Sequence, residues 1–312
     1  MTTTSSVMQS QPVRKKKRRL SGIRRRETRE AWLILTPILL YFSIFFLFPV
    51  ISNLYISFTK WNGIIGAPVW VGLQNYMQYL KPPYPLIISN TLLFAVLGLV
   101  FQTALAFMIA VLLNQKVGGR GVFRALFYIP TLTSSAVTAQ VAFAFISPYD
   151  GVLNEVLKLF GYPIVVWTID PSWMRAFIIL YSVWRGVGGP VVLFLAALQG
   201  IHREIYEAAM VDGASAKDML LRITLPLLRP MIIFVLVTGM IGSFQIFEAV
   251  LLMSKGGPRN MTNVMLLQIY NDAFVNTNMG LASAGSMVMA IILLGFSVTN
   301  MRIMNRGRVG KD

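Results

Sequence analysis

Six long windows that are nearly free of charged residues constrain this chain more than any other feature of its sequence. No charge occurs between Glu30 and Lys60, between Lys81 and Lys116, between Arg124 and Asp150, or between Asp272 and Arg302, and windows 176–202 and 230–254 hold only Arg185 and Glu248. A charge at the bilayer centre is costly, and a transmembrane helix needs roughly 20 apolar residues. The windows predict an all-α membrane protein with six transmembrane helices, near residues 32–58, 87–113, 122–147, 174–199, 229–253 and 280–302.

The distribution of basic residues predicts the orientation of these spans. Of 28 Lys and Arg, ten fall in residues 14–29, three in the loop 114–124, four in the loop 200–229 and four after residue 301, which places 21 on one side. The alternate loops hold six. An excess of Lys and Arg marks the cytoplasmic side, so both termini are expected in the cytoplasm. The net charge of +16 could suggest nucleic acid, but this one-sided distribution favours a topology signal that also contacts anionic membrane lipid, and no nucleic-acid partner is predicted.

The spans predict a simple domain organisation. We expect a basic disordered cytoplasmic tail over residues 1–30, a first transmembrane helix and extracytoplasmic loop over 31–86, a five-helix core over 87–303 with a cytoplasmic loop at 200–228, and a cytoplasmic tail over 304–312. The first span is too long for a signal-peptide core and should remain as an anchor. The chain has no Cys, which excludes a disulfide framework.

The loop from Tyr206 to Pro226 reads "YEAAMVDGASAKDMLLRITLP" and is more strongly patterned than a plain connection between spans requires. Good helix formers precede Gly213, a typical left-handed helix end. Ser215 and Asp218 then resemble a capping box and predict a second helix, which Pro226 should stop or kink. The small and acidic residues of this loop disfavour a helix lying on the membrane. We therefore predict a helix–turn–helix that docks onto a cytoplasmic partner.

The stretch "EAAMVDGASAKDMLLRITLP" resembles the Glu-Ala-Ala motif of permease subunits in ATP-binding-cassette importers. Further segments are similar to the carbohydrate-uptake branch of that family, which includes the maltose and glycerol-phosphate permeases: "WVGLQNY" (70–76), "SNTLLF" (89–94), "FYIP" (127–130), "GVLN" (151–154), "LAALQGI" (195–201) and "SKGGP" (254–258). The resemblance covers about residues 30–305. It implies the MetI-like permease fold, in which the motif forms a coupling helix seated in a cleft of a cytoplasmic ATPase. The matching coupling residues are Glu207, Ala208, Ala209, Asp212, Gly213, Ala214 and Pro226.

The same resemblance implies the partners of the chain. They are a second permease subunit (usually a different chain), a pair of ATPase subunits that bind ATP and Mg, and an extracytoplasmic solute-binding protein. The resemblance also implies that the complex lies at the cytoplasmic membrane of a bacterium or archaeon. The chain itself is expected to be no enzyme and to hold no cofactor or metal. It has no Gly-rich phosphate loop with Lys and Ser or Thr, and its one histidine, His202, lies in the cytoplasmic loop.

Polar side chains within spans are functional candidates because they are costly there. They are Asn90, Gln102, Gln140, Arg185, Gln245 and Glu248. Single amides can equally form hydrogen bonds between helices. Arg185 precedes "GVGGP" (186–190), where Gly and Pro should loosen or break the span. Arg185 and Glu248 either neutralise each other or find partners on another subunit, or Arg185 meets the hydroxyls or an anionic group of a solute.

Small residues on the fifth span suggest where a solute could pass. Gly239, Gly242, Ser243 and Ile246 recur at the helical spacing of three and four, which allows either close helix packing or a groove. In the sugar permeases that this chain resembles, the matching part of span five contacts sugar, as does the part of span four that matches Ser182, Gly186 and Gly189. The maltose-type permease has larger polar and aromatic residues here, so either the second permease binds the sugar or the path is wider. The predicted path residues are Ser182, Arg185, Gly186, Gly189, Gly239, Gly242, Ser243, Ile246 and Glu248.

Two other classes of protein compete with this interpretation. A secondary transporter of a small polar solute would usually show an internal repeat and ion-coupling carboxylates at mid-membrane, and only Glu248 qualifies. An intramembrane enzyme would need a nucleophile with its base, paired acids or a metal cluster. The sequence favours a transmembrane subunit of an ATP-driven importer for a sugar, oligosaccharide or related polyol.

Overall fold

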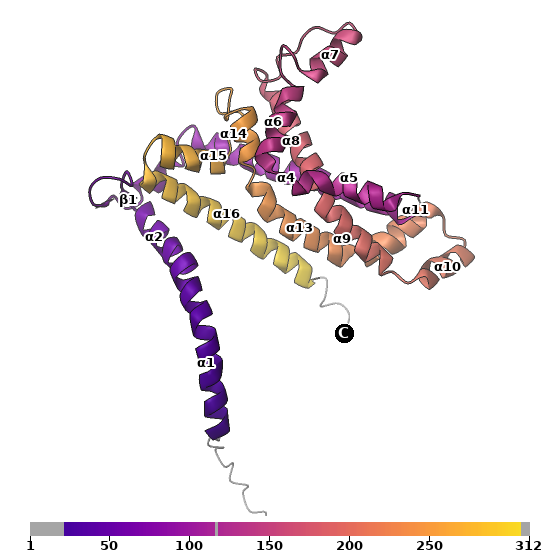
Figure 1. Cartoon of the computed structure of the whole chain (residues 1–312), viewed down its shortest axis with the longest axis horizontal. Helices are drawn as coiled ribbons and strands as arrows, with labels where there is room; N and C mark the ends of the chain where they lie inside the picture. Colours follow the sequence, from indigo (N-terminus) through magenta and orange to yellow (C-terminus); the bar gives the residue numbers. More distant parts are fainter. Residues whose placement is uncertain (1–21, 116–117, 307–312) are drawn as a thin grey trace, which may run out of the picture. The chain divides into compact units, whose positions relative to one another are not determined.

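The computed structural model describes residues 22–115 and 118–306, which are helical almost throughout (Figure 1). By its internal contacts the chain divides into two units, residues 1–53 and 54–312, which are described separately. The elements are α1 (Gly22–Phe42), η1 (Ser43–Leu47), α2 (Phe48–Ser57), β1 (Thr59–Lys60), β2 (Val69–Trp70), α3 (Gln74–Gln78), α4 (Tyr84–Asn114), α5 (Arg120–Leu132), α6 (Ser135–Phe145), α7 (Val152–Leu159), α8 (Pro171–Gly186), α9 (Gly188–Gln199), α10 (Arg203–Val211), α11 (Ala216–Asp218), η2 (Met219–Thr224), α12 (Leu225–Leu227), α13 (Arg229–Phe244), α14 (Glu248–Met253), α15 (Met265–Tyr270), η3 (Asn271–Val275) and α16 (Met279–Arg306).

Within the described residues, four helical segments are long and apolar enough to cross a membrane: Glu27–Ser57, Tyr84–Asn114, Arg229–Met253 and Met279–Thr299. They correspond to the first, second, fifth and sixth predicted spans. The bent pair α8 and α9 corresponds to the fourth predicted span and forms a fifth crossing if the two helices are taken together.

The third predicted span, 122–147, differs from expectation because it is divided into two shorter helices, α5 and α6. Thr133 between them has an extended backbone, and its hydroxyl donates to the Ile129 carbonyl at 3.0 Å. Pro130 has no backbone N–H, and the hydroxyls of Thr133 and Ser134 compete with helical hydrogen bonds. These local effects interrupt a stretch whose hydropathy alone suggests one continuous helix.

Two π-helical turns each precede a proline. η1 ends two residues before Pro49, and η2 ends two residues before Pro226. A proline ring clashes with the carbonyl four residues earlier, and a wider turn relieves that clash. Pro226 therefore does not stop its helix, as the sequence suggested it could; the chain stays helical through α12 and is interrupted at Leu228.

Helix α4 is central to the second unit. It packs against α8, α9, α13 and α15. One apolar cluster joins Phe94 of α4 to α6, α8 and α14, a second joins Ala106 to α9 and α13, and a third joins Ile87 and Ala95 to α15 and α16. A helix that is apolar on every side is suited to such a position, because each face contacts a different neighbour.

A short antiparallel hairpin, β1 with β2, pairs Thr59 with Trp70. Asn75 of α3 donates hydrogen bonds to the Ser57 and Thr59 carbonyls, at 2.9 and 2.8 Å. Gly280, at the start of α16, lies so close to the Thr59 carbonyl that an added Cβ would overlap it. These contacts attach the hairpin to α3 and to the beginning of the last span.

A buried carboxylate organises the segment between α14 and α16. Asp272 of η3 is only 2% exposed and accepts hydrogen bonds from Gln268 at 2.9 Å, Asn276 at 3.1 Å and the Tyr84 hydroxyl at 3.4 Å. Burial raises the pKa of the Asp272 carboxyl above its ordinary value. The network connects η3 to the start of α4.

Candidate functional site

The fourth span is broken at the "RGVGGP" segment, as its composition predicted. Helices α8 and α9 meet at Val187 with a bend of 47°. Pro190 has no N–H, so the Gly186 carbonyl four residues earlier lacks its usual helical donor. The Gln102 side-chain amide of α4 donates to that carbonyl at 2.9 Å, and the Thr131 hydroxyl of α5 donates to the Arg185 carbonyl at 2.8 Å. Neighbouring helices thus satisfy the backbone of the break, which is the condition for such a break within a membrane.

The glycines of this segment have different surroundings. A Cβ at Gly188 would lie 2.5 Å from the Phe127 carbonyl, so Gly188 permits α9 to pack closely against α5. A Cβ at Gly186 would meet the Gln102 amide at 2.6 Å. Gly189 has no neighbouring heavy atom within 4 Å of such a position. Close packing therefore requires glycine at 188, where the neighbour is backbone, whereas at 186 the neighbour is a movable side-chain amide and at 189 the space is free.

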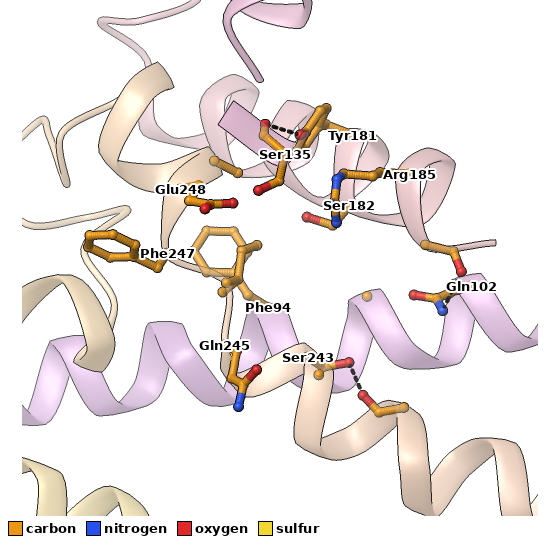
Figure 2. Close-up of a pocket in the computed structure, with 16 residues that line it drawn as sticks. Phe94, Gln102, Ser135, Tyr181, Ser182, Arg185, Ser243, Gln245, Phe247 and Glu248 are labelled. Carbon is orange, nitrogen blue, oxygen red and sulfur yellow. Dashed lines mark hydrogen bonds between the residues drawn. The ribbon is translucent and has the colours of Figure 1, made fainter. Parts of the chain in front are cut away.

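A cavity of about 260 Å³ lies beside the break, among residues of α4, α8, α13 and α14 (Figure 2). Eight of the nine predicted path residues line it: Ser182, Arg185, Gly186, Gly239, Gly242, Ser243, Ile246 and Glu248. Gly189 is not among the lining residues. Gln102 and Gln245, which were candidates as polar residues within spans, line it as well. Their role in transport remains a prediction, but the structure brings them together.

Sequence reasoning missed the remaining lining residues, which are Phe94, Gly98, Ser135, Tyr181, Phe247 and Ala249. Aromatic residues in an apolar span have the same pattern whether they face a core or a cavity. Ser135 follows the break in the third predicted span, so only the packing of α6 reveals its position. A search for polar residues next to helix breaks could have found Ser135, but no sequence signal distinguishes the others.

Opposite charges line the cavity without forming a direct ion pair. Among the described residues, no ion pair within 4.0 Å joins Arg185 of α8 to Glu248 of α14. Arg185 is partly buried, and its Nε has no hydrogen-bond partner. The hydroxyls of Ser182 and Ser243 donate to carbonyls of their own helices, at 2.7 and 2.8 Å, which leaves their lone pairs available as acceptors. The cavity therefore offers unused donors and acceptors together with both signs of charge.

Two other polar candidates have different surroundings. Asn90 is 2% exposed and donates to the carbonyls of Asn260 and Asn263, at 2.9 and 3.0 Å. Its own carbonyl accepts from Arg175 at 2.8 Å. Asn90 therefore holds the loop before α15 against α4. Gln140 is exposed and does not line the cavity.

The predicted helix–turn–helix is confirmed. Helix α10 ends in a Schellman arrangement, in which the Ala214 N–H donates to the Ala209 carbonyl at 2.9 Å and Gly213 has φ +79°. The Ser215 hydroxyl accepts from the Asp218 N–H at 3.2 Å and donates to its carboxylate at 2.5 Å. This hydroxyl holds the pKa of the Asp218 carboxyl below its ordinary value. Both sides of the turn are thus capped.

The coupling residues differ in exposure. Glu207, Ala208, Asp212 and Gly213 are exposed, whereas Ala209 is buried. The buried side of α10 is further attached by a hydrogen bond of 3.0 Å between the hydroxyls of Tyr206 and Thr224. Large apolar side chains on the free side, Met210 and Val211, are also exposed. The motif therefore presents a mixed acidic and apolar surface on a rigid support.

Several apolar spans, a broken span beside a polar cavity and a capped, exposed helix pair define a membrane-embedded transport subunit. Within the described residues no group of three or more His, Cys, Asp or Glu could hold a metal ion. The chain belongs to the family of binding-protein-dependent transport system inner membrane components, whose sequence model matches residues 102–306. It is therefore a multi-pass permease subunit of the cytoplasmic membrane, of the ATP-binding-cassette importer type, and not an enzyme.

Named relatives support this assignment. The chain is 33% identical to the lactose transport system permease protein LacF of Rhizobium radiobacter, over 81% of this chain and 86% of the relative. It is 31% identical to the arabinooligosaccharides transport system permease protein AraP of Halalkalibacterium halodurans, over 86% of each chain. A crystal structure of a bacterial alginate importer in complex with an alginate pentasaccharide-bound periplasmic protein contains a chain of the same fold, with a TM-score of 0.79, 26% identity and coverage of 90% and 96%. The fold is that of MetI-like importer permeases.

Proposed function

We propose that this chain forms part of the translocation path for a sugar, oligosaccharide or related polyol. The observation that carries the proposal is the cavity beside the broken fourth span. Its amides, hydroxyls and opposite charges can exchange hydrogen bonds with a solute that has many hydroxyl groups. Phe94, Tyr181 and Phe247 add ring faces against which the less polar side of a sugar can lie. The carbohydrate systems named for the relatives are consistent with this solute class.

The small residues of α13 keep the path open. A Cβ at Gly242 meets no heavy atom within 4 Å, whereas a Cβ at Gly239 would meet Leu99 at 2.6 Å. Gly242 therefore borders free space and Gly239 permits packing against α4. In the proposed function, the solute passes between this face and Arg185 of α8.

The exposed face of α10 is the proposed contact with a cytoplasmic ATPase, which binds ATP and Mg. The Glu207 carboxylate pairs with Arg203 at 2.9 Å on the helix surface, and Val211 is 88% exposed. A surface that combines an acidic rim with exposed apolar side chains is typical of a docking site for a soluble protein. The caps at Gly213 and Ser215 make the pair rigid enough to transmit movement.

The proposed assembly has a second permease subunit, usually a different chain, a pair of ATPase subunits and an extracytoplasmic solute-binding protein. The basic residues of segments 14–29 and 200–229 support the orientation, with both termini in the cytoplasm. The proposed organisation keeps the first span with its outer loop and the five-helix core with its coupling loop. The prediction of a disordered tail over residues 1–30 was wrong for residues 22–30, which belong to helix α1, and the tail residues 1–21 and 307–312 lie outside the described residues.

The test is purification of the complete importer from cells that co-express its operon neighbours, followed by a screen of neutral and charged carbohydrates against the solute-binding protein. Each bound carbohydrate is then tested for stimulation of ATP hydrolysis in proteoliposomes. We expect stimulation by at least one carbohydrate, and its reduction in Arg185→Gln, with Lys81→Gln as a control for loss of an exposed charge outside the cavity. Binding and stimulation by non-carbohydrate solutes alone would contradict the proposed solute class.

A further inference from the structure

Helix α7, between α6 and α8, has an apolar face that nothing in the described chain covers. Val152, Val156 and Leu159 are spaced by four and three residues, so they share one side of the helix, and all three are exposed. Leu159 is 84% exposed and Phe160, which follows it, is 74% exposed. Figure 1 shows α7 projecting beyond the ends of α6 and α8, away from α16.

The loop that carries α7 is rigidly built, so this exposure is a feature of an ordered structure. Asn154, which is fully buried, donates to the carbonyls of Pro148 and Val165, at 3.1 and 3.0 Å. Its side-chain carbonyl accepts from the Val165 N–H at 3.2 Å and from the Trp167 ring N–H at 3.1 Å. One asparagine therefore connects both ends of the loop, and it fixes the direction in which the opposite, apolar face of α7 points.

An apolar groove continues from the base of α7 along the membrane-embedded helices. It has a volume of about 400 Å³ and is lined by Val137, Val141 and Phe145 of α6, Leu153 of α7, and Leu180 of α8. The Thr138 hydroxyl in its wall is already bonded to the Tyr181 hydroxyl at 2.8 Å. The groove thus offers an apolar surface, which suits a hydrocarbon chain better than a polar ligand.

Three observations favour lipid over a soluble protein as the occupant. The groove runs between α6 and α8, which belong to the predicted third and fourth spans, and is therefore at membrane depth. The loop carries Tyr149 and Tyr162, and Trp173 lies in the first turn of α8; all three are exposed, and Tyr and Trp are enriched where a membrane meets water. Glu155 and Lys158, the charged residues of α7, pair with each other at 2.6 Å, so the helix itself has no net charge for electrostatic docking, although Asp150 and Asp170 lie in the flanking loop.

We propose that α7 lies in the membrane–water interface with its apolar face towards the acyl chains, and that the groove between α6 and α8 holds an acyl chain of a membrane phospholipid. By the proposed topology this is the extracytoplasmic leaflet. The interfacial helix anchors the outer end of the broken third span, where neither α5 nor α6 is long enough to cross the membrane alone. The inference is independent of which solute the importer carries.

The absence of Cys makes a direct test possible. Four single-cysteine variants are spin-labelled. Two have the cysteine on the apolar face of α7, at Leu159 or Val156, and one has it in the groove, at Val141. The fourth, at Lys158, is a control on the polar side of α7. The complete importer is reconstituted into vesicles of phosphatidylethanolamine and phosphatidylglycerol. Collision of each label with oxygen, which concentrates in the acyl region, is compared with collision with a water-soluble nickel chelate.

We expect the ratio of oxygen to nickel collisions to be higher at Leu159→Cys, Val156→Cys and Val141→Cys than at Lys158→Cys. A ratio at the two apolar positions of α7 equal to that at Lys158→Cys would place α7 in water and overturn the proposal. Low collision rates with both reagents would show that protein, such as the second permease, covers the face, and would overturn it too. Loss of nickel collisions only after the solute-binding protein is added would identify a soluble docking surface instead. Agreement between Leu159→Cys and Val156→Cys guards against a local distortion by one label.

Discussion

Gly213 is the residue on which the rigidity of the α10–α11 turn depends most directly. Its φ of +79° is accessible to glycine without strain, and its N–H donates to the Met210 carbonyl at 3.1 Å. No heavy atom lies within 4 Å of an added Cβ, so a substitution here changes backbone preference without a steric clash. The position therefore isolates conformational strain from packing.

The magnitudes follow from the backbone. Alanine in a left-handed conformation costs about 1–2 kcal/mol, which corresponds to a roughly 5- to 30-fold loss of the correctly turned state. Asparagine tolerates this conformation better and should cost less. Proline cannot adopt a positive φ and removes the donor to Met210, so Gly213→Pro should cost about 3 kcal/mol or more, roughly a hundredfold. We expect uptake to decrease in the order glycine, asparagine, alanine, proline.

The assay is uptake of the cognate solute into membrane vesicles, with co-purification of the ATPase and membrane yield of the chain measured in parallel. Yield should be unchanged across the series, because Gly213 lies in an exposed loop, while ATPase recovery and uptake fall together. Uptake by Gly213→Pro at the wild-type rate, with the ATPase bound and stimulated by solute, would refute the role of a rigid coupling turn. Loss of yield in Gly213→Asn would show that the turn serves folding rather than coupling.

Three further outcomes are expected. In Gly242→Leu, the new side chain should enter the cavity and reduce uptake of a large solute more than of a small one, at normal yield. Gly188→Ala, whose Cβ would lie 2.5 Å from the Phe127 carbonyl, should instead lower the yield of folded complex. Equal uptake of both solutes by assembled Gly242→Leu would exclude this face from the path. Because burial raises the pKa of Asp272, the folded state retains its proton to higher pH than the unfolded state, so the free energy of unfolding should fall as pH rises from the ordinary aspartate value through the raised one. Thermal unfolding in detergent from acidic to neutral pH should show this fall, and Asp272→Asn should flatten it; an equal slope in both proteins would contradict the assignment. Ala216→Cys should react with a maleimide only after membrane permeabilisation, and labelling in intact cells by an impermeant reagent would reverse the proposed orientation.

The features that could be predicted from sequence depend on local chemistry. Gly213 has a left-handed backbone, and Ser215 caps the next helix through Asp218, three residues later. The turn and the cap could therefore be predicted without tertiary structure. The break of the fourth span was likewise local, because Pro190 deprives the Gly186 carbonyl of its donor. Charge-free windows located the spans because desolvation of a charge is costly wherever the helix lies.

The features that escaped prediction depend on helix rotation and distant contacts. Gly188 packs against α5 whereas Gly189, the next residue, faces neither α5 nor the cavity, and hydropathy cannot distinguish two adjacent glycines. Asn90 was ambiguous because its partners Asn260 and Asn263 come 170 and 173 residues later. The division of the third span at Thr133 was missed because an apolar window has the same mean hydropathy whether or not its helix is continuous.

The order of elements along the chain connects the coupling loop to the cavity by short routes. Helix α9 runs from the break at Val187 to Gln199, and three residues separate it from α10, which begins at Arg203. At 1.5 Å per residue, its 12 residues span about 18 Å from the cavity to the exposed helix pair. On the other side of the pair, α12 leads through the single residue Leu228 into α13, which carries Gly239 and Gly242. In the proposed function, movement of α10 by an ATPase therefore acts on both walls of the cavity, and the bend at Val187 allows α9 to move without carrying α8 with it. Gln102 of α4 and Thr131 of α5 would continue to donate hydrogen bonds to the carbonyls of the break during that movement, because neither donor belongs to α9.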